Sequence, residues 1–224
     1  MDLFFVCLFC NFFLCRVHPL FSRCKDSLAF NHNNITDSKF QKEFTDRNTC
    51  ILFGDAAGVV IVEQSEENCL LETITETNGE FGKDLYLTNQ KNLINDEEVI
   101  ANNKLHQNGR VVYKWAIQTL SYGLKSLARK NCIALDEVSF FLPHSANYRL
   151  LEAVFHELKI PMDKCLDSVR EYGNTSAASI PLAWYNGIMN KKIQKNDILL
   201  LMGFGGGFTY GGIGIKNQIE NKYV

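Results

Sequence analysis

The chain has 224 residues, a formal net charge of −2 and 12% aromatic residues, enough for one ordinary domain with a sizeable core. It lacks the basic excess typical of nucleic-acid-binding proteins. Eight cysteines in a chain that is not a short secreted domain do not predict a disulfide framework, so we expect reduced thiols and a cytoplasmic protein. The Cys7–Cys10 pair lies in a hydrophobic context that fits a metal site poorly, so no metal site is predicted.

Residues 1–43 differ in character from the rest of the chain. Residues 1–14 are nearly all Phe, Leu and Cys, and a polar tract follows at 31–34. The apolar run is shorter than the ~20 residues that a membrane span needs, and Asp2 stands where a signal peptide would be positively charged. We expect an atypical, poorly ordered segment without membrane association. A frameshift or a wrongly assigned start within a longer gene explains its composition better than a redesigned site does.

Residues 44–217 show the pattern of one ordered domain, with a short tail at 218–224. Apolar and β-branched runs predict strands, and apolar residues at helical spacing predict helices. Residues 78–104 are polar and predict a long loop. The strands are expected at 49–53, 57–63, 69–75, 138–142, 197–202 and 210–216, and the helices at 111–128, 148–158 and 176–188. This alternation predicts α/β layers around a central sheet.

Three motifs follow one another at the ends of these elements. They are Pro143-His144-Ser145-Ala146-Asn147, Tyr172-Gly173-Asn174-Thr175-Ser176-Ala177-Ala178-Ser179, and Gly203-Phe204-Gly205-Gly206-Gly207-Phe208-Thr209-Tyr210-Gly211. A His and an Asn aimed at one oxygen can stabilise the charge that develops on a thioester carbonyl, and a glycine turn lets backbone N–H groups approach a second oxyanion. Taken singly, each has an ordinary explanation: a structural histidine, a helix N-cap, or a flexible turn.

In this order, with their flanking residues, the motifs resemble the C-terminal half of β-ketoacyl-acyl carrier protein synthase III, a condensing enzyme of the thiolase superfamily. The resemblance runs from about Phe44 to Lys216. It implies a thiolase-like layered α/β fold, present as its C-terminal half, with a mixed five-stranded sheet and helices on its faces.

The resemblance also implies a reaction and its partners. It implies a cytoplasmic, homodimeric acyltransferase of fatty acid biosynthesis. An acyl group passes from acyl-coenzyme A to a cysteine. Malonyl-acyl carrier protein then loses carbon dioxide, and its carbanion attacks the enzyme thioester to give a 3-oxoacyl-acyl carrier protein. No cofactor is needed, and the protein partner is the acyl carrier protein.

By the same resemblance, His144 and Asn174 stabilise the enolate of the malonyl thioester, and Gly206 belongs to the oxyanion hole for acyl transfer. The other matching positions are binding residues. Asn147 and Gly109 lie beside the pantetheine arm, Arg47 beside the coenzyme A adenine, and Phe53 and Phe204 at the acyl pocket and the wall of the site. Lys114 and Arg149 match basic positions that dock the acidic carrier protein, although two further such positions hold His156 and Glu157.

The nucleophile is not identified. In the family a cysteine followed by a small residue and Gly-Phe precedes the region that matches Phe44, and no cysteine here has that context. We therefore expect a truncated chain that is a poor condensing enzyme alone. The alternatives are a thioester-binding remnant without condensing activity and a related synthase with another acyl acceptor, of polyketide or quinolone type.

Overall fold

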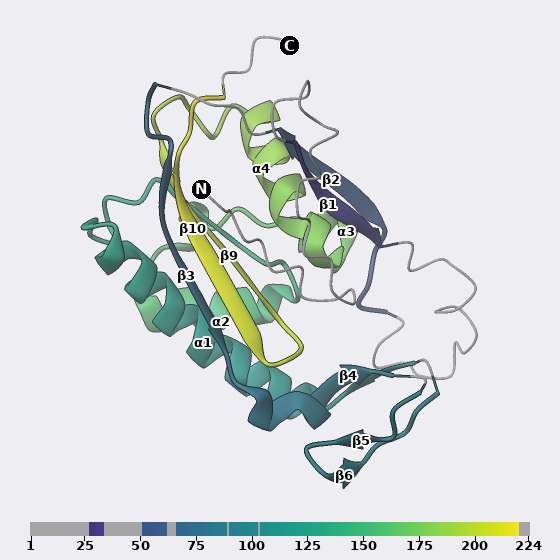
Figure 1. The fold of residues 1–224 in the computed structure, drawn as a ribbon. Coiled ribbons are helices and arrows are strands. Elements are labelled where there is room, and N and C mark those ends of the chain that lie inside the picture. Colours follow the sequence, from purple (N-terminus) through teal and green to yellow (C-terminus); the bar gives the residue numbers. More distant parts are fainter. Residues whose placement is uncertain (1–26, 34–50, 62–65, 89, 103, 220–224) are drawn as a thin grey trace.

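The computed structural model describes residues 27–33, 51–61, 66–88, 90–102 and 104–219. Its central feature is a mixed sheet in the order β3-β10-β9-β8 (Figure 1). β10 and its neighbours β3 and β9 are antiparallel, whereas β8 runs parallel to β9. The bounds of these strands are Leu70–Thr77 for β3, Phe140–Pro143 for β8, Ile198–Gly205 for β9 and Thr209–Lys216 for β10.

The α/β class and the mixed sheet are confirmed, but the described sheet has four strands and not the five predicted. At the outer edge of β8 there is only a single parallel bridge, between Phe141 and Cys165. The chain turns through the short 3-10 helix η3 (Met162–Lys164) just before that bridge, so one residue reaches the edge without extending into a strand.

Helices cover both faces of the sheet (Figure 1). α1 (Gly109–Lys130) and α2 (Tyr148–Leu158) pack on one face, and α4 (Ser179–Met189) lies on the other. Alternate residues of β9 point to the two cores: Leu200 and Met202 pack with α1 and α2, while Leu199 and Leu201 pack with Trp184 of α4. A strand buried on both faces reads as a continuous apolar run, and Ile198–Met202 is such a run.

α1 approaches β9 closely because position 123 is glycine. A Cβ on Gly123 would lie 1.8 Å from the Cε of Met202. The helix begins after Asn108, whose side chain accepts a hydrogen bond from the N–H of Val111, and ends with Arg129 and Lys130 in its last turn. The predicted helices at 111–128 and 148–158 are thus confirmed, the first with slightly wider bounds.

Two of the predicted elements differ from the structure. Residues 49–53 were predicted as a buried strand, but among the described ones Ile51 is 78% exposed and only Phe53 pairs, in a single bridge with Asn174. Residues 78–104 were predicted as a loop, yet they hold the 3-10 helix η2 (Gly79–Asp84) and the strands β4 (Leu85–Leu87), β5 (Leu93–Ile94) and β6 (Glu97–Glu98). β5 pairs with β6, and β4 pairs with β7 (Leu105–Gln107), in strands too short to show a periodic pattern.

The elements around Asn174 are short. α3 (Val169–Tyr172) precedes it, and the 3-10 helix η4 (Ser176–Ala178) follows it and leads into α4. The helix predicted at 176–188 therefore begins later, at Ser179, because Ser176 has a positive φ of 53° that an α-helix does not accommodate.

One strand lies within the segment predicted to be atypical. β1 (Ser27–Asn33) pairs antiparallel with β2 (Ala56–Ile61), and α4 packs against β2. Residues 27–33 of that segment are therefore paired with the domain. The rest of that segment lies outside the described residues, and the domain boundary at residue 44 stays a prediction. Of the helices that the structure describes, none has the length and apolar content to cross a bilayer.

Candidate active site

A hollow of about 140 Å³ lies where β8 and β9 end and α1 and α2 begin. It brings together most of the predicted site residues from separate parts of the chain. Those that line it are Phe53, Gly109, His144, Asn147, Asn174 and Phe204. Since polar side chains converge on a concave, largely apolar surface, this is the candidate active site.

His144 follows the last residue of β8. Its backbone N–H donates to the carbonyl oxygen of Met202 on β9 at 2.7 Å, which continues the parallel ladder by one residue. Its ring packs edge-on against Phe204 with the ring centres 5.1 Å apart. The strand end and the aromatic contact therefore fix both the backbone and the ring of His144.

The imidazole of His144 is neutral near physiological pH. Only 6% of the residue is exposed, and burial lowers its pKa to about 4, although a backbone hydrogen bond with Ser176 raises it in part. Nδ1 lies 2.8 Å from the Oγ of Ser179, at the start of α4. A neutral imidazole has one N–H to donate and one nitrogen to accept.

We expect His144 to make the protein less stable in mild acid. The folded ring stays neutral down to about pH 4, whereas an unfolded histidine takes up a proton below about pH 6.5. Between these values the unfolded state binds more protons, so the free energy of unfolding falls as the pH falls, by about 2 kcal/mol from pH 7 to pH 5. Urea denaturation of the wild type and of His144→Gln at both pH values measures this. An equal pH dependence in the two proteins would contradict it.

Asn174 is held by its backbone and by its side-chain oxygen. Its N–H donates to the carbonyl oxygen of Leu52 at 2.8 Å, and its own carbonyl accepts from the N–H of Gly54 at 3.0 Å. Its Oδ1 accepts the N–H of Ser176 at 2.9 Å, although the N-cap residues of η4 and α4 are Thr175 and Ala178. Because an N–H can only donate, this contact fixes the orientation of the amide and leaves Nδ2 available to a ligand in the hollow.

The glycine turn connects β9 to β10. Gly205 lines the hollow and Gly206 follows it in the turn. Within the described residues, the N–H of Gly206 takes part in no hydrogen bond. A Cβ at this position would lie 3.2 Å from the carbonyl oxygen of Leu85, so a side chain would crowd the neighbouring strand. The geometry is compatible with a backbone donor beside the hollow.

Asn147 and Gly109 lie at the beginnings of two helices. Asn147 caps α2, since its Oδ1 accepts from the N–H groups of Arg149 at 2.9 Å and Leu150 at 3.4 Å. Gly109 opens α1, and a Cβ there would meet only the Nε2 of Gln107, at 3.7 Å. Packing therefore does not require this glycine. A side chain would instead project into space beside the hollow.

The residues predicted to dock the carrier protein are exposed on these two helices. Lys114 follows Tyr113 of α1, and Arg149 precedes Leu150 of α2; both Tyr113 and Leu150 line the hollow. Arg47 lies outside the described residues.

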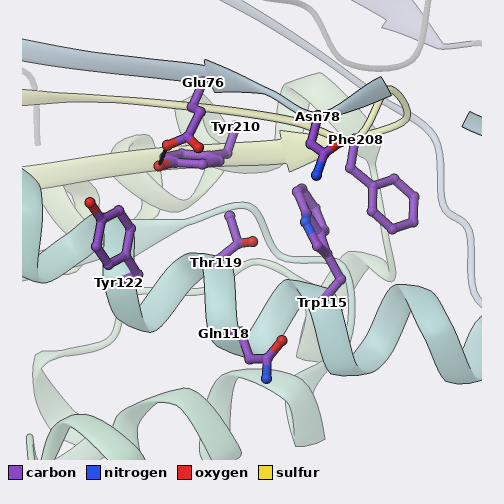
Figure 2. Close-up of a pocket in the computed structure, with 8 residues that line it drawn as sticks. All are labelled: Glu76, Asn78, Trp115, Gln118, Thr119, Tyr122, Phe208 and Tyr210. Atoms are coloured by element: carbon purple, nitrogen blue, oxygen red, sulfur yellow. Dashed lines mark hydrogen bonds between the residues drawn. The ribbon is translucent and has the colours of Figure 1, made fainter. Parts of the chain in front are cut away.

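A larger hollow, of about 280 Å³, is lined in part by Trp115 of α1. Figure 2 shows its lining, in which Tyr210 donates a hydrogen bond to the carboxylate of Glu76. Trp115 packs against one residue of each hollow: its ring centre is 4.3 Å from that of Phe208, which lines the larger one, and 6.2 Å from that of Phe204, which lines the smaller one. The described residues that line the larger hollow include no histidine, whereas the smaller one has His144 for thioester chemistry.

Neither hollow is lined by any of the cysteines that the structure describes. Those are Cys69, Cys132 and Cys165. Cys165 is buried and its pKa is raised by burial and by Asp167, so its thiol is protonated. Among the described residues there is also no cluster of His, Cys, Asp and Glu side chains that could hold a metal ion.

Sequence reasoning did not assign a function to Ser179. This residue belongs to one of the three motifs, but its contact with His144 depends on how α4 packs against the end of β8. Motif and helical spacing do not reveal such a contact between distant elements.

Two family models match the chain. The model described as 3-oxoacyl-[acyl-carrier-protein] synthase III C terminal matches residues 128–216, and that described as 3-oxoacyl-[acyl-carrier-protein] synthase III matches residues 35–79. The chain is 43% identical over 175 residues to β-ketoacyl-[acyl-carrier-protein] synthase III 2 of Bacillus subtilis, covering 78% of this chain and 54% of that protein. The chain belongs to the β-ketoacyl-acyl carrier protein synthase III family. The predicted family is thereby confirmed.

Other synthase III proteins agree. The chain is 39% identical over 179 residues to the synthase III of Campylobacter jejuni, covering 80% of this chain and 54% of that protein. The crystal structure of the synthase III from Thermus thermophilus superposes with a TM-score of 0.73 and 31% identity, over 77% of this chain and 54% of that one. The chain thus spans about half the length of the synthase III proteins that it matches.

Proposed function

We propose that this chain acts in fatty acid biosynthesis as an acyltransferase of the synthase III type, in the decarboxylative Claisen condensation of acyl-coenzyme A with malonyl-acyl carrier protein. Within that reaction, the described residues bind the malonyl thioester and stabilise its carbanion. One observation supports this most strongly. His144 and Asn174 line one hollow, and the protein holds one polar atom of each side chain in place.

The chemistry follows from these two side chains. When the bond between the α-carbon and the carboxylate breaks, carbon dioxide leaves. The electron pair of that bond stays with the α-carbon, and the enolate that results has charge on the thioester oxygen. Hydrogen bonds from His144 and Asn174 to that oxygen stabilise the charge more than they stabilise the neutral carbonyl, which lowers the barrier. The carbanion then attacks an acyl-cysteine, whose C–S bond breaks to release the thiolate.

The partners are proposed on the same basis. Gly206 N–H donates to the acyl oxyanion, Phe53 and Phe204 contact the acyl group, and Asn147 and Gly109 lie along the pantetheine arm, with Arg47 at the adenine. Lys114 and Arg149 attract the acidic carrier protein toward the mouth of the hollow, an effect that salt should weaken. His156 and Glu157 reduce the positive charge of this docking surface. Activity in the cytoplasm, as a homodimer and without a cofactor, belongs to the same proposal.

Malonyl-thioester decarboxylation tests the proposal without requiring the nucleophile. When no acyl-cysteine is present, the enolate takes up a proton and an acetyl thioester is released. We expect the chain to convert malonyl-acyl carrier protein into acetyl-acyl carrier protein faster than the rate without protein. A rate equal to the uncatalysed one, in folded protein, would contradict the proposal.

A second candidate is a thioester-binding protein without condensing activity, which fits a hollow whose described lining residues include no cysteine. Labelling with a reactive acyl-coenzyme A analogue separates the two. We expect no site-selective adduct on Cys69, Cys132 or Cys165, because none of them lies at the site. Peptide mapping after labelling measures this. Selective acylation of Cys7 or Cys10, lost on mutation to Ser, would instead favour a complete condensing enzyme.

A further inference from the structure

Three buried serines form a hydrogen-bond network behind His144. Ser145, Ser168 and Ser179 are each at most 1% exposed. The N–H of Ser145 donates to the Oγ of Ser179 at 3.2 Å, and the N–H of Ser168 donates to the Oγ of Ser145 at 3.1 Å. The Oγ of Ser168 donates to the carbonyl oxygen of Ser179 at 3.1 Å. The network thus connects the segment after β8 with α3 and α4.

The direction of these bonds determines where the proton of Ser179 goes. Its Oγ already accepts from the N–H of Ser145, and a hydroxyl has one proton to donate. Among the residues that the structure describes, the only acceptor within hydrogen-bond distance of this Oγ is the Nδ1 of His144, at 2.8 Å. A buried hydroxyl proton is almost always paired, so the bond runs from Ser179 to Nδ1.

We infer that Ser179 is a positioning residue that keeps His144 in the tautomer with its proton on Nε2. This inference rests on the proposed function for its consequence, because Nε2–H is the donor that a thioester oxygen in the hollow needs. The other tautomer would place the proton on Nδ1, beside Ser179, and would present an unprotonated Nε2 to the substrate.

The neutral state of the ring makes this choice important. Burial lowers the pKa of His144 to about 4, so the imidazolium, which has a donor on both nitrogens, is scarce near pH 7. With one proton on the ring, a donor at Nε2 requires an acceptor at Nδ1. The hydroxyl of Ser179 satisfies that acceptor.

The test is the tautomer of His144 in the full chain, measured by ¹⁵N NMR of histidine-labelled protein without substrate at pH 7. We expect a protonated Nε2 and an unprotonated Nδ1. In Ser179→Ala the proton should move partly or fully to Nδ1. Ser168→Ala is the matched control, because it also removes a hydroxyl from the network. Ser168 is 1% exposed, and its hydroxyl donates to the carbonyl oxygen of Ser179 and not to the ring of His144. The tautomer of His144 in this variant should be that of the wild type.

A proton on Nδ1 in the wild type would overturn the inference, and so would an unchanged tautomer in folded Ser179→Ala. If that variant does not fold, the wild-type spectrum alone decides. The measurement uses no substrate, so it is independent of the proposed function. If Nε2 is protonated but the chain fails to decarboxylate malonyl-acyl carrier protein, the proposed function is contradicted and the inference about the tautomer stands. In an active chain, Ser179→Ala should lower decarboxylation about tenfold or more, and Ser168→Ala should not.

Discussion

Replacing either His144 or Asn174 with alanine should reduce malonyl-thioester decarboxylation by ~10²–10³-fold. Both side chains line the same hollow, and both have their second polar atom fixed, His144 by Ser179 and Asn174 by the N–H of Ser176. Donors fixed in this way need no reorganisation when charge appears on the thioester oxygen. The loss of one donor therefore removes most of the stabilisation of the enolate.

The double variant distinguishes cooperation from independent effects. Two donors on one oxygen act as a unit, so His144→Ala combined with Asn174→Ala should be little slower than the slower single variant. If the two residues were only a core histidine and a helix cap, each change would lower stability by ~1 kcal/mol and leave turnover per folded molecule intact. Decarboxylation should be measured on protein whose folded fraction is known. Wild-type rates in both single variants would contradict the assignment.

Gly54→Ala should cost at least ~3 kcal/mol of stability, the upper end for an overpacked site. A Cβ at Gly54 would lie 1.7 Å from the carbonyl oxygen of Tyr172 and 2.9 Å from its carbon, and these backbone atoms cannot move away as a flexible side chain can. The residues around Gly54 also hold Asn174 in place, through the bonds to Leu52 and Gly54. Relief of the clash must therefore separate residues 52–54 from Asn174, so decarboxylation should fall as well.

Gly79→Ala is the control for this prediction. A Cβ at Gly79 has no atom within 4 Å, so the change should alter stability by less than ~0.5 kcal/mol. Urea denaturation of the two variants and the wild type under the same conditions gives the comparison. Equal stability of Gly54→Ala and Gly79→Ala would show that the close approach of residues 54 and 172 does not form.

The parts of the fold that the sequence predicted well are those with long periodic patterns. The helix at 148–158 and the apolar strand before the glycine turn agree with α2 and β9, because burial of one side of a helix or both faces of a strand leaves a clear pattern. The segment at 49–53 was misjudged, since its conformation depends on pairing with Asn174, far away in the sequence. Apolar content alone did not reveal that partner.

The candidate site was predicted through its motifs and completed by packing. His144, Asn174 and Phe204 could be singled out because they stand in recognisable motifs, and the structure brings them to one hollow. The contact of Ser179 with His144 depends on where α4 begins relative to the end of β8. That relation belongs to tertiary structure, and hydrophobic periodicity contains no information about it.

The most direct test of the central claim is a crystal structure of the chain with a non-decarboxylating malonyl-thioester analogue. We predict that its thioester oxygen lies about 3 Å from both the Nε2 of His144 and the Nδ2 of Asn174, the distance of ordinary hydrogen bonds. An analogue bound in the hollow of Glu76 and Tyr210, or one whose thioester oxygen contacts neither His144 nor Asn174, would contradict the claim.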